Sequence, residues 1–121
     1  MTCWKVSWNA RRYDYQRIIH DFNNGDVTSF LQSKGNAPIV NLPIIDDIVY
    51  ISCKGLKIMQ CRVMSNFHTY DEPQNDIYAI GDNRPHAANY TYLQMQIIQT
   101  YNENEKFRGN QRTWTRTKYK Q

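Results

Sequence analysis

The sequence predicts an α+β fold in which a small, strongly curved β-sheet or barrel is closed at its ends by one or two helices. The chain has 121 residues, which is enough for one domain with one hydrophobic core. Its hydrophobic fraction is only 40%, but 13% of the residues are aromatic, and each ring buries a large area. Several segments alternate with the period of strands, whereas helical spacing is confined to the first third. We therefore expect a single domain over residues 1–121, with a basic C-terminal tail over residues 106–121.

Alternating apolar residues predict a strand at the start of the chain and a hairpin near its middle. Residues 3–8 place large apolar side chains on one face only, as a half-buried strand does. Residues 47–53 are rich in β-branched residues and apolar on both faces. After a turn over residues 54–56, the chain returns as a second strand over residues 57–64. The apolar face of this second strand is formed by Met59, Cys61 and Val63.

Helical spacing follows the first strand. Asp14 is suited to cap the N-terminus of a helix, and Gly25 can adopt the left-handed conformation that ends one. Between them, four apolar residues recur at the spacing of a single helical face: Tyr15, Ile18, Ile19 and Phe22. A second short helical turn is expected from residue 26 or 28, through Phe30 and Leu31, to Gly35.

The second half of the chain predicts a long loop, one strand and a short closing strand. Residues 66–89 are polar and contain several aromatic residues, and only residues 76–80 have strand character. A loop of this length in a small domain is often functional. Residues 91–101 predict a strand, and a short strand is expected around residues 112–116. In the strand over 91–101 we expect Leu93, Met95 and Ile97 to face inward and Gln94, Gln96 and Gln99 to be exposed or at an edge.

Charge is concentrated at the C-terminus. The tail over residues 106–121 holds six Lys and Arg and no acid, whereas the remaining residues hold nine basic and eleven acidic groups. Phe107, Trp114 and Tyr119 are interleaved with the basic residues. Because cations attract phosphate and flat rings stack on bases, this pattern predicts RNA or DNA binding. The expected phosphate-binding residues are Arg11, Arg12, Lys54, Arg108, Arg112, Arg116 and Lys118.

Trp8 and Asn9 are the sharpest local candidates for base recognition. A base pocket needs a flat ring for stacking and an amide that both donates to and accepts from a base edge. These two neighbours supply both groups. The alternative is that Trp8 belongs to the core face of the first strand and Asn9 caps a turn. Arg11 and Arg12 follow directly, and they either clamp a phosphate or are simply solvated.

Other features narrow the class of protein. The three cysteines have no CxxC spacing, so we expect buried thiols rather than a disulfide framework or a zinc site. The chain lacks a signal peptide and a membrane-length apolar run, which predicts an intracellular protein of the cytoplasm or nucleus. The histidines are scattered, and no phosphate loop or nucleophile motif is present. We expect no metal, no cofactor and no enzymatic activity.

The first half of the chain resembles EVE domains of the PUA-like superfamily, to which YTH domains also belong. The segment Trp4-Lys5-Val6-Ser7-Trp8-Asn9, followed by a helix, is similar to their opening strand. The segment Asp46-Asp47-Ile48-Val49 resembles their Gly-Asp-x-Val turn and central strand, and Arg62-Val63 resembles the strand that follows. The similarity covers about residues 3–65, with a further strand near Trp114. Asp46 stands where the family usually has glycine, and the glycines common in its second hairpin strand are absent.

The resemblance implies a mixed, strongly curved barrel of about five or six strands with one to three flanking helices. It also implies a binding module without chemistry, which holds RNA or a modified base in single-stranded or flipped form. The positions that match its base pocket are Ser7, Trp8, Asn9 and Ser52, with Lys54 beside them and Trp114 as a looser candidate.

Two other functions remain open at the level of sequence. A protein–protein adaptor would use the loop over residues 66–89 as its contact. A metal-dependent nuclease would use Asp46 and Asp47 as an acid pair, with a histidine and with Lys57 on the partner strand.

Overall fold

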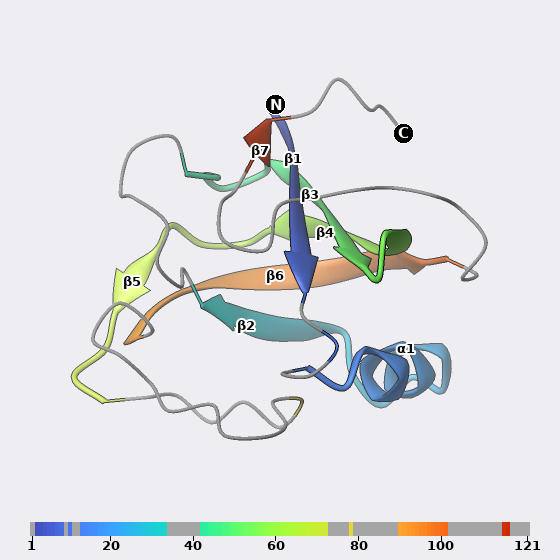
Figure 1. The fold of residues 1–121 in the computed structure, drawn as a ribbon. Coiled ribbons are helices and arrows are strands. Elements are labelled where there is room, and N and C mark those ends of the chain that lie inside the picture. Colours follow the sequence, from blue (N-terminus) through green and yellow to red (C-terminus); the bar gives the residue numbers. More distant parts are fainter. Residues whose placement is uncertain are drawn as a thin grey trace.

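The computed structural model describes residues 2–8, 10, 13–33, 42–72, 78 and 90–101, and the backbone of residues 115 and 116. Within these residues it contains one seven-stranded sheet and one α-helix (Figure 1). The elements are β1 (Cys3–Trp8), α1 (Tyr15–Asn23), β2 (Ser29–Ser33), β3 (Ile48–Cys53), β4 (Leu56–Val63), β5 (His68–Thr69), β6 (Thr91–Thr100) and β7 (Thr115–Arg116).

The strands form a mixed sheet in the order β2-β6-β4-β3-β1-β7. β1 and β3 are parallel, and the other pairs are antiparallel. β5 pairs with the first residues of β6, and β4 pairs with the residues of β6 that follow. The sheet curls into a half-barrel, so that in Figure 1 β1 passes over β6 and ends close to β2. This curvature confirms the expected small, strongly curved mixed sheet with a flanking helix.

The hydrophobic core lies on the inner face of this curl. β1 contributes Trp4, Val6 and Trp8, which are at most 6% exposed, and Ile18 of α1 packs into the same cluster. The inward-facing residues expected for β4 and β6 are confirmed as well, although β4 is also buried on its other face at Lys57 and Gln60. The buried inner residues of β4 and β6 are Met59, Cys61, Val63, Leu93, Met95 and Ile97.

Both ends of α1 are capped as the sequence predicts. Asp14 Oδ1 accepts a hydrogen bond of 3.2 Å from the backbone N–H of Arg17, which would otherwise lack a partner in the first turn. At the other end Gly25 has φ 79°, its N–H donates to Phe22 O, and the N–H of Asp26 donates to Asp21 O. These two bonds form a Schellman motif, which requires the left-handed conformation that glycine adopts without strain.

The expected second helical turn is wrong, because residues 29–33 form strand β2 instead. β2 pairs with β6 from Ser29 opposite Gln96 to Ser33 opposite Tyr92. The Schellman motif redirects the chain, and the backbone groups of this short segment then find partners on β6. Local spacing alone does not report such a partner, since it lies 59 to 67 residues away in the sequence.

The predicted hairpin is confirmed, with a tighter turn than expected. Lys54 has φ 55° and Gly55 has φ 76°, and Leu56 already pairs with Cys53. Two central residues with positive φ are the signature of a type I′ turn, which matches the twist of the flanking strands.

Two further strands lie in the second half of the chain. β5 (His68–Thr69) lies in the segment predicted as a loop and was not expected. β7 lies within the predicted closing strand and pairs with β1. The segment 76–80 falls outside the described residues except for Tyr78, which is in a turn.

Candidate nucleic-acid interface

The basic tail is joined to the sheet at the free edge of β1. β7 pairs with β1 antiparallel, with Arg116 opposite Trp4 and Thr115 opposite Lys5. Lys5, which pairs with Thr115, is partly exposed. Arg108, Arg112, Lys118 and Trp114 lie outside the described residues. The pairing therefore places the backbone of one tail cation, Arg116, next to a strand that carries Lys5.

The outer face of the sheet, opposite the core, is polar. From β7 a single row of directly opposed residues crosses β1, β3 and β4 to reach β6. This row consists of Thr115, Lys5, Tyr50, Gln60 and Gln99. The adjacent row holds Ser7, Ser52 and Lys57. In these rows Lys5, Ser7 and Gln99 are at least partly exposed, whereas the polar residues at the centre of the sheet, Tyr50, Ser52, Lys57 and Gln60, are at most 2% exposed.

Lys57 is the unexpected member of this face, because its side chain is only 1% exposed. Its Nζ lies 4.1 Å from the centre of the Tyr101 ring and 5.6 Å from that of Tyr50. Both distances are within the range of cation–π attraction, which strengthens when the cation is removed from water. Tyr101 Oη also donates to Gln60 Oε1 at 3.1 Å. In the sequence Lys57 was notable only as a lysine near two aspartates, since the ring at residue 101 approaches it only through pairing of β4 with β6.

Ser7 and Ser52, both predicted base-binding residues, are brought together on the outer face. Ser7 Oγ donates to the carbonyl oxygen of Ser52 at 3.4 Å. The Ser52 side chain is fully buried. Its Oγ and the Nε2 of Gln60 have no hydrogen-bond partner within the part of the chain that the structure describes. Buried polar atoms of this kind are uncommon and mark places where a further group is expected.

Trp8 lies on the opposite side of the sheet from Ser7 and Ser52. Its side chain is 3% exposed, and its ring stacks on Tyr13 at 4.9 Å and meets the edge of Phe30 at 5.7 Å. Its Nε1 donates to Gln32 Oε1 of β2 at 2.9 Å. Trp8 is therefore a core residue, which is the second of the two possibilities considered from the sequence. The bond joins β1 to β2 across the inside of the curl, so Trp8 does not share a pocket with the two serines.

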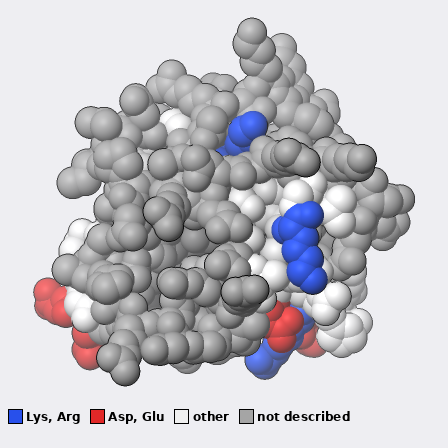
Figure 2. Space-filling model, viewed as in Figure 1, with Lys and Arg blue, Asp and Glu red and all other residues white. Residues whose placement is uncertain are grey.

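Of the remaining predicted cations, only Lys54 lies within the described residues. Lys54 is exposed in the turn between β3 and β4, with its Nζ 5.9 Å from the centre of the Tyr15 ring. Asn9, Arg11 and Arg12 lie outside the described residues. In the view of Figure 2 the described Lys and Arg side chains form separate spots.

Asp47 has a structural role that its sequence position did not reveal. Its Oδ1 accepts from Thr2 N at 2.9 Å, and its Oδ2 accepts from Trp4 Nε1 at 3.0 Å and Ile44 N at 3.1 Å. Burial by itself would raise the pKa of this carboxyl group, but the three N–H donors together hold its pKa below the ordinary value.

Its neighbour Asp46 is exposed and has φ 73°, a left-handed conformation that glycine adopts without strain. Among the described residues, no group of three or more His, Cys, Asp or Glu side chains lies close enough together to hold a metal ion. Of the two acids considered for a nuclease, Asp47 is therefore a buried carboxylate that accepts three N–H groups, and Asp46 is exposed.

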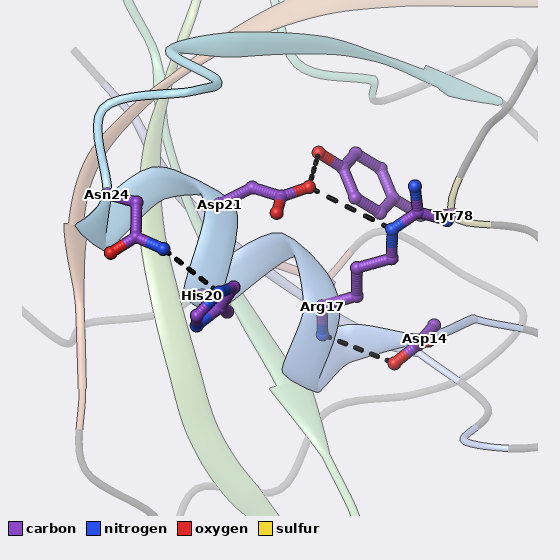
Figure 3. Close-up of polar contacts among 6 residues, drawn as sticks. All are labelled: Asp14, Arg17, His20, Asp21, Asn24 and Tyr78. Carbon is purple, nitrogen blue, oxygen red and sulfur yellow. Dashed lines mark hydrogen bonds and ion pairs between the residues drawn. The ribbon is translucent and has the colours of Figure 1, made fainter.

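A polar network on α1 connects the helix to Tyr78 (Figure 3). Tyr78 Oη donates to Asp21 Oδ2 at 2.9 Å, Arg17 Nε lies 4.0 Å from the same oxygen, and the Arg17 guanidinium lies over the Tyr78 ring. Burial, together with the hydrogen bond to Asp21 and the charge of Asp21, raises the pKa of Tyr78 to about 12. His20 contacts Asn24 on the same helix at 2.9 Å. These contacts stabilise α1 and its attachment to Tyr78.

The three cysteines are free thiols; Cys53 and Cys61 are buried as expected, whereas Cys3 is only partly buried. Burial raises the pKa of the Cys61 thiol, which keeps it protonated and unreactive. None of the described helices has the length and apolar character needed to cross a membrane. The chain matches no family model and no curated protein.

Proposed function

We propose that the protein binds single-stranded RNA or DNA, with the tail over residues 106–121 contacting the phosphates and the outer face of the sheet lying beside the strand. The observation that carries the proposal is the pairing of β7 with β1. It attaches a segment with six Lys and Arg and no acid to the edge of a polar sheet face. A flexible solubilising tail has no need of such an attachment.

The contribution of the tail is electrostatic. Each phosphate that a cation neutralises releases counterions, so the logarithm of the affinity falls with the logarithm of the salt concentration by about 0.7 per contact for single strands. Outside the tail the chain has more acids than bases. Those residues give no net attraction for a polyanion, and the salt dependence should therefore come from the tail.

The salt dependence of binding tests the proposal directly. Fluorescence anisotropy with single-stranded RNA and DNA at a series of salt concentrations gives the slope for the wild type. The variant Arg108→Gln/Arg112→Gln/Lys118→Gln should lower that slope by about 2, at about 0.7 per lost contact. The matched control, Arg108→Lys/Arg112→Lys, keeps the charge and should keep the slope.

Two outcomes would contradict the proposal. One is a wild type that does not bind at low salt, and the other is a charge-removed variant with an unchanged slope. Running the bound oligonucleotides on a gel after incubation with Mg²⁺ separates binding from metal-dependent cleavage, which the proposal does not include.

We infer further that the fold is PUA-like and that an unpaired base is the specific ligand. The support is the resemblance over residues 3–65 together with the buried Ser52 hydroxyl. A hydroxyl can read a base edge, whereas the ring of Trp8 is covered by Tyr13. Ser52→Ala should reduce the preference between oligonucleotides of different base composition while leaving the salt slope unchanged. An unaltered preference would remove Ser52 from the site.

A further inference from the structure

Three large apolar side chains are exposed together at the end of the β3–β4 hairpin away from its turn. Ile44 is 61% exposed, Ile45 is 49% exposed and Met64 is 46% exposed. Ile44 and Ile45 precede β3, and Met64 follows β4. We call these three residues the Ile–Met patch. The hydrogen bond from Asp46 N to Val63 O brings the two segments to the same end of the hairpin. Exposed apolar side chains that gather at one place are candidates for an interaction surface.

The Ile–Met patch is held in place by backbone hydrogen bonds. Asp46 N donates to Val63 O at 2.9 Å, and Val63 N donates to Asp47 O at 2.9 Å, which ties the turn to the end of β4 next to Met64. The turn itself is closed by Asp47 N donating to Ile44 O at 3.0 Å and by Ile44 N donating to the Asp47 side chain. A surface that is already ordered loses little conformational freedom when a partner binds.

Opposite charges flank the patch. Asp46 is exposed directly after Ile45, and Arg62 is exposed two residues before Met64, on the same face of β4. Neither forms an ion pair within the described chain. Exposed Gln94 and Gln96 on the neighbouring strand β6 add a polar border. An apolar centre with a polar rim is the usual composition of a protein–protein contact.

We propose that the Ile–Met patch is the contact surface of a homodimer with two-fold symmetry. In such a contact, residue i of one copy meets residue j of the other and residue j meets residue i. One surface that carries both an unpaired acid and an unpaired base on the borders of an apolar centre is complementary to itself. Asp46 of each copy then meets Arg62 of the other, and the isoleucines and methionines pack between them.

The oligomeric state of the full chain tests this proposal, measured by sedimentation equilibrium over a concentration series up to about 1 mM, the weak end of specific association. The wild type should show a monomer–dimer equilibrium. Ile44→Ser/Met64→Ser should weaken it by about tenfold or more, because the contact loses much of its apolar area. The matched control is Ile98→Ser. Ile98 is an exposed isoleucine of β6 outside the patch, and its replacement should leave the equilibrium unchanged.

Mixing two charge variants tests the pairing itself. Arg62→Glu alone places acid against acid in both pairs, and Asp46→Lys alone places base against base, so each protein should be monomeric. An equimolar mixture should form a heterodimer, because both charge pairs become attractive again. A lysine is compatible with the backbone at position 46, since Lys54 adopts a similar φ in this chain. Circular dichroism confirms that each variant is folded.

The proposal is overturned if the wild type is monomeric throughout the concentration series, if Ile98→Ser dissociates the dimer as strongly as the patch variant, or if the mixed charge variants stay monomeric. Dimerisation is independent of the proposed nucleic-acid function. The charge-removed tail variant should dimerise normally, and the patch variant should keep the salt slope of the wild type.

Discussion

Replacing Asp47 should cost more stability than replacing any other acidic residue that the structure describes. Its carboxylate is 5% exposed and accepts three N–H groups, from Thr2, Trp4 and Ile44. These donors belong to the segment before β1, to β1 itself and to the turn before β3. The side chain therefore links the two parallel strands at the centre of the sheet to the turn that precedes them.

The expected cost follows from the donors that would be left without a partner. Each buried or partly buried N–H that loses its acceptor costs about 1–3 kcal/mol. Since neighbouring bonds are not additive and Thr2 and Ile44 are near the surface, we expect about 3–5 kcal/mol for Asp47→Ala. Asp47→Asn should be nearly as harmful, because its amide nitrogen faces donors rather than acceptors. Either loss is a large fraction of the roughly 5–15 kcal/mol that stabilises a typical domain.

Urea denaturation followed by tryptophan fluorescence measures this loss, since the Trp4 indole is itself a donor to Asp47. The pH dependence gives a second readout. The pKa of Asp47 is lowered in the folded state, so its ionised form contributes stability at pH values above the unfolded pKa of about 4. That contribution is lost as the pH falls through the lower folded pKa. Asp47→Asn should therefore show a smaller loss of stability between about pH 5 and pH 2 than the wild type.

The reasoning would be refuted by an Asp47→Asn protein within about 1 kcal/mol of the wild type, the expected size of a single neutral hydrogen bond. It would also be refuted if the variant and the wild type lost stability in parallel at low pH. Asp14→Asn is a suitable control, because Asp14 is a more exposed acid that caps α1 with one bond.

Three further substitutions test the backbone and the core, each by urea denaturation. Gly25→Ala should destabilise the protein by about 1 kcal/mol through backbone strain alone, because φ is 79° and no atom lies within 4 Å of the added Cβ; no change would mean that the Schellman motif relaxes. Asp46→Gly should stabilise the protein by about 0.5 kcal/mol by relieving φ 73°, and a loss of stability would argue against the strain. Trp8→Phe should cost about 1–3 kcal/mol of stability, because the Gln32 side chain loses the donor that Trp8 Nε1 provides. If the folded variant bound oligonucleotides much more weakly than the wild type, Trp8 would be part of the binding site after all.

The sequence predicts the local elements well where one side of a segment is apolar. The alternation of β1, β4 and β6 and the apolar stripe of α1 follow from side-chain order, and the structure confirms which of these residues are buried. The cap at Asp14 and the stop at Gly25 also follow from residue type, because each satisfies backbone groups only a few positions away. Both signals can be read from the sequence because the residues involved lie within one helical turn or one strand of each other.

Prediction fails where a partner is distant in the sequence. Residues 29–33 have the spacing of a short helix, yet they form a strand because β6 offers a free edge. Trp8 is equally suited to a base pocket and to a core, and only the approach of Gln32 and Tyr13 places it inside. The burial of Lys57 beneath the Tyr101 ring depends on the register of β4 against β6.

The amino-acid order by itself determined the amphipathic strands and helix, the capped helix ends, the presence of the hairpin and the separation of a basic tail from an otherwise slightly acidic chain. The tertiary structure alone decided that the tail is attached beside β1, that Asp47 is a buried acceptor for three donors, and that two isoleucines and a methionine lie together on the surface. The physical reason is the range of the forces involved. Backbone conformation and alternation respond to neighbours within a few residues, whereas burial, register and hydrogen-bond partners depend on segments that meet only when the sheet curls.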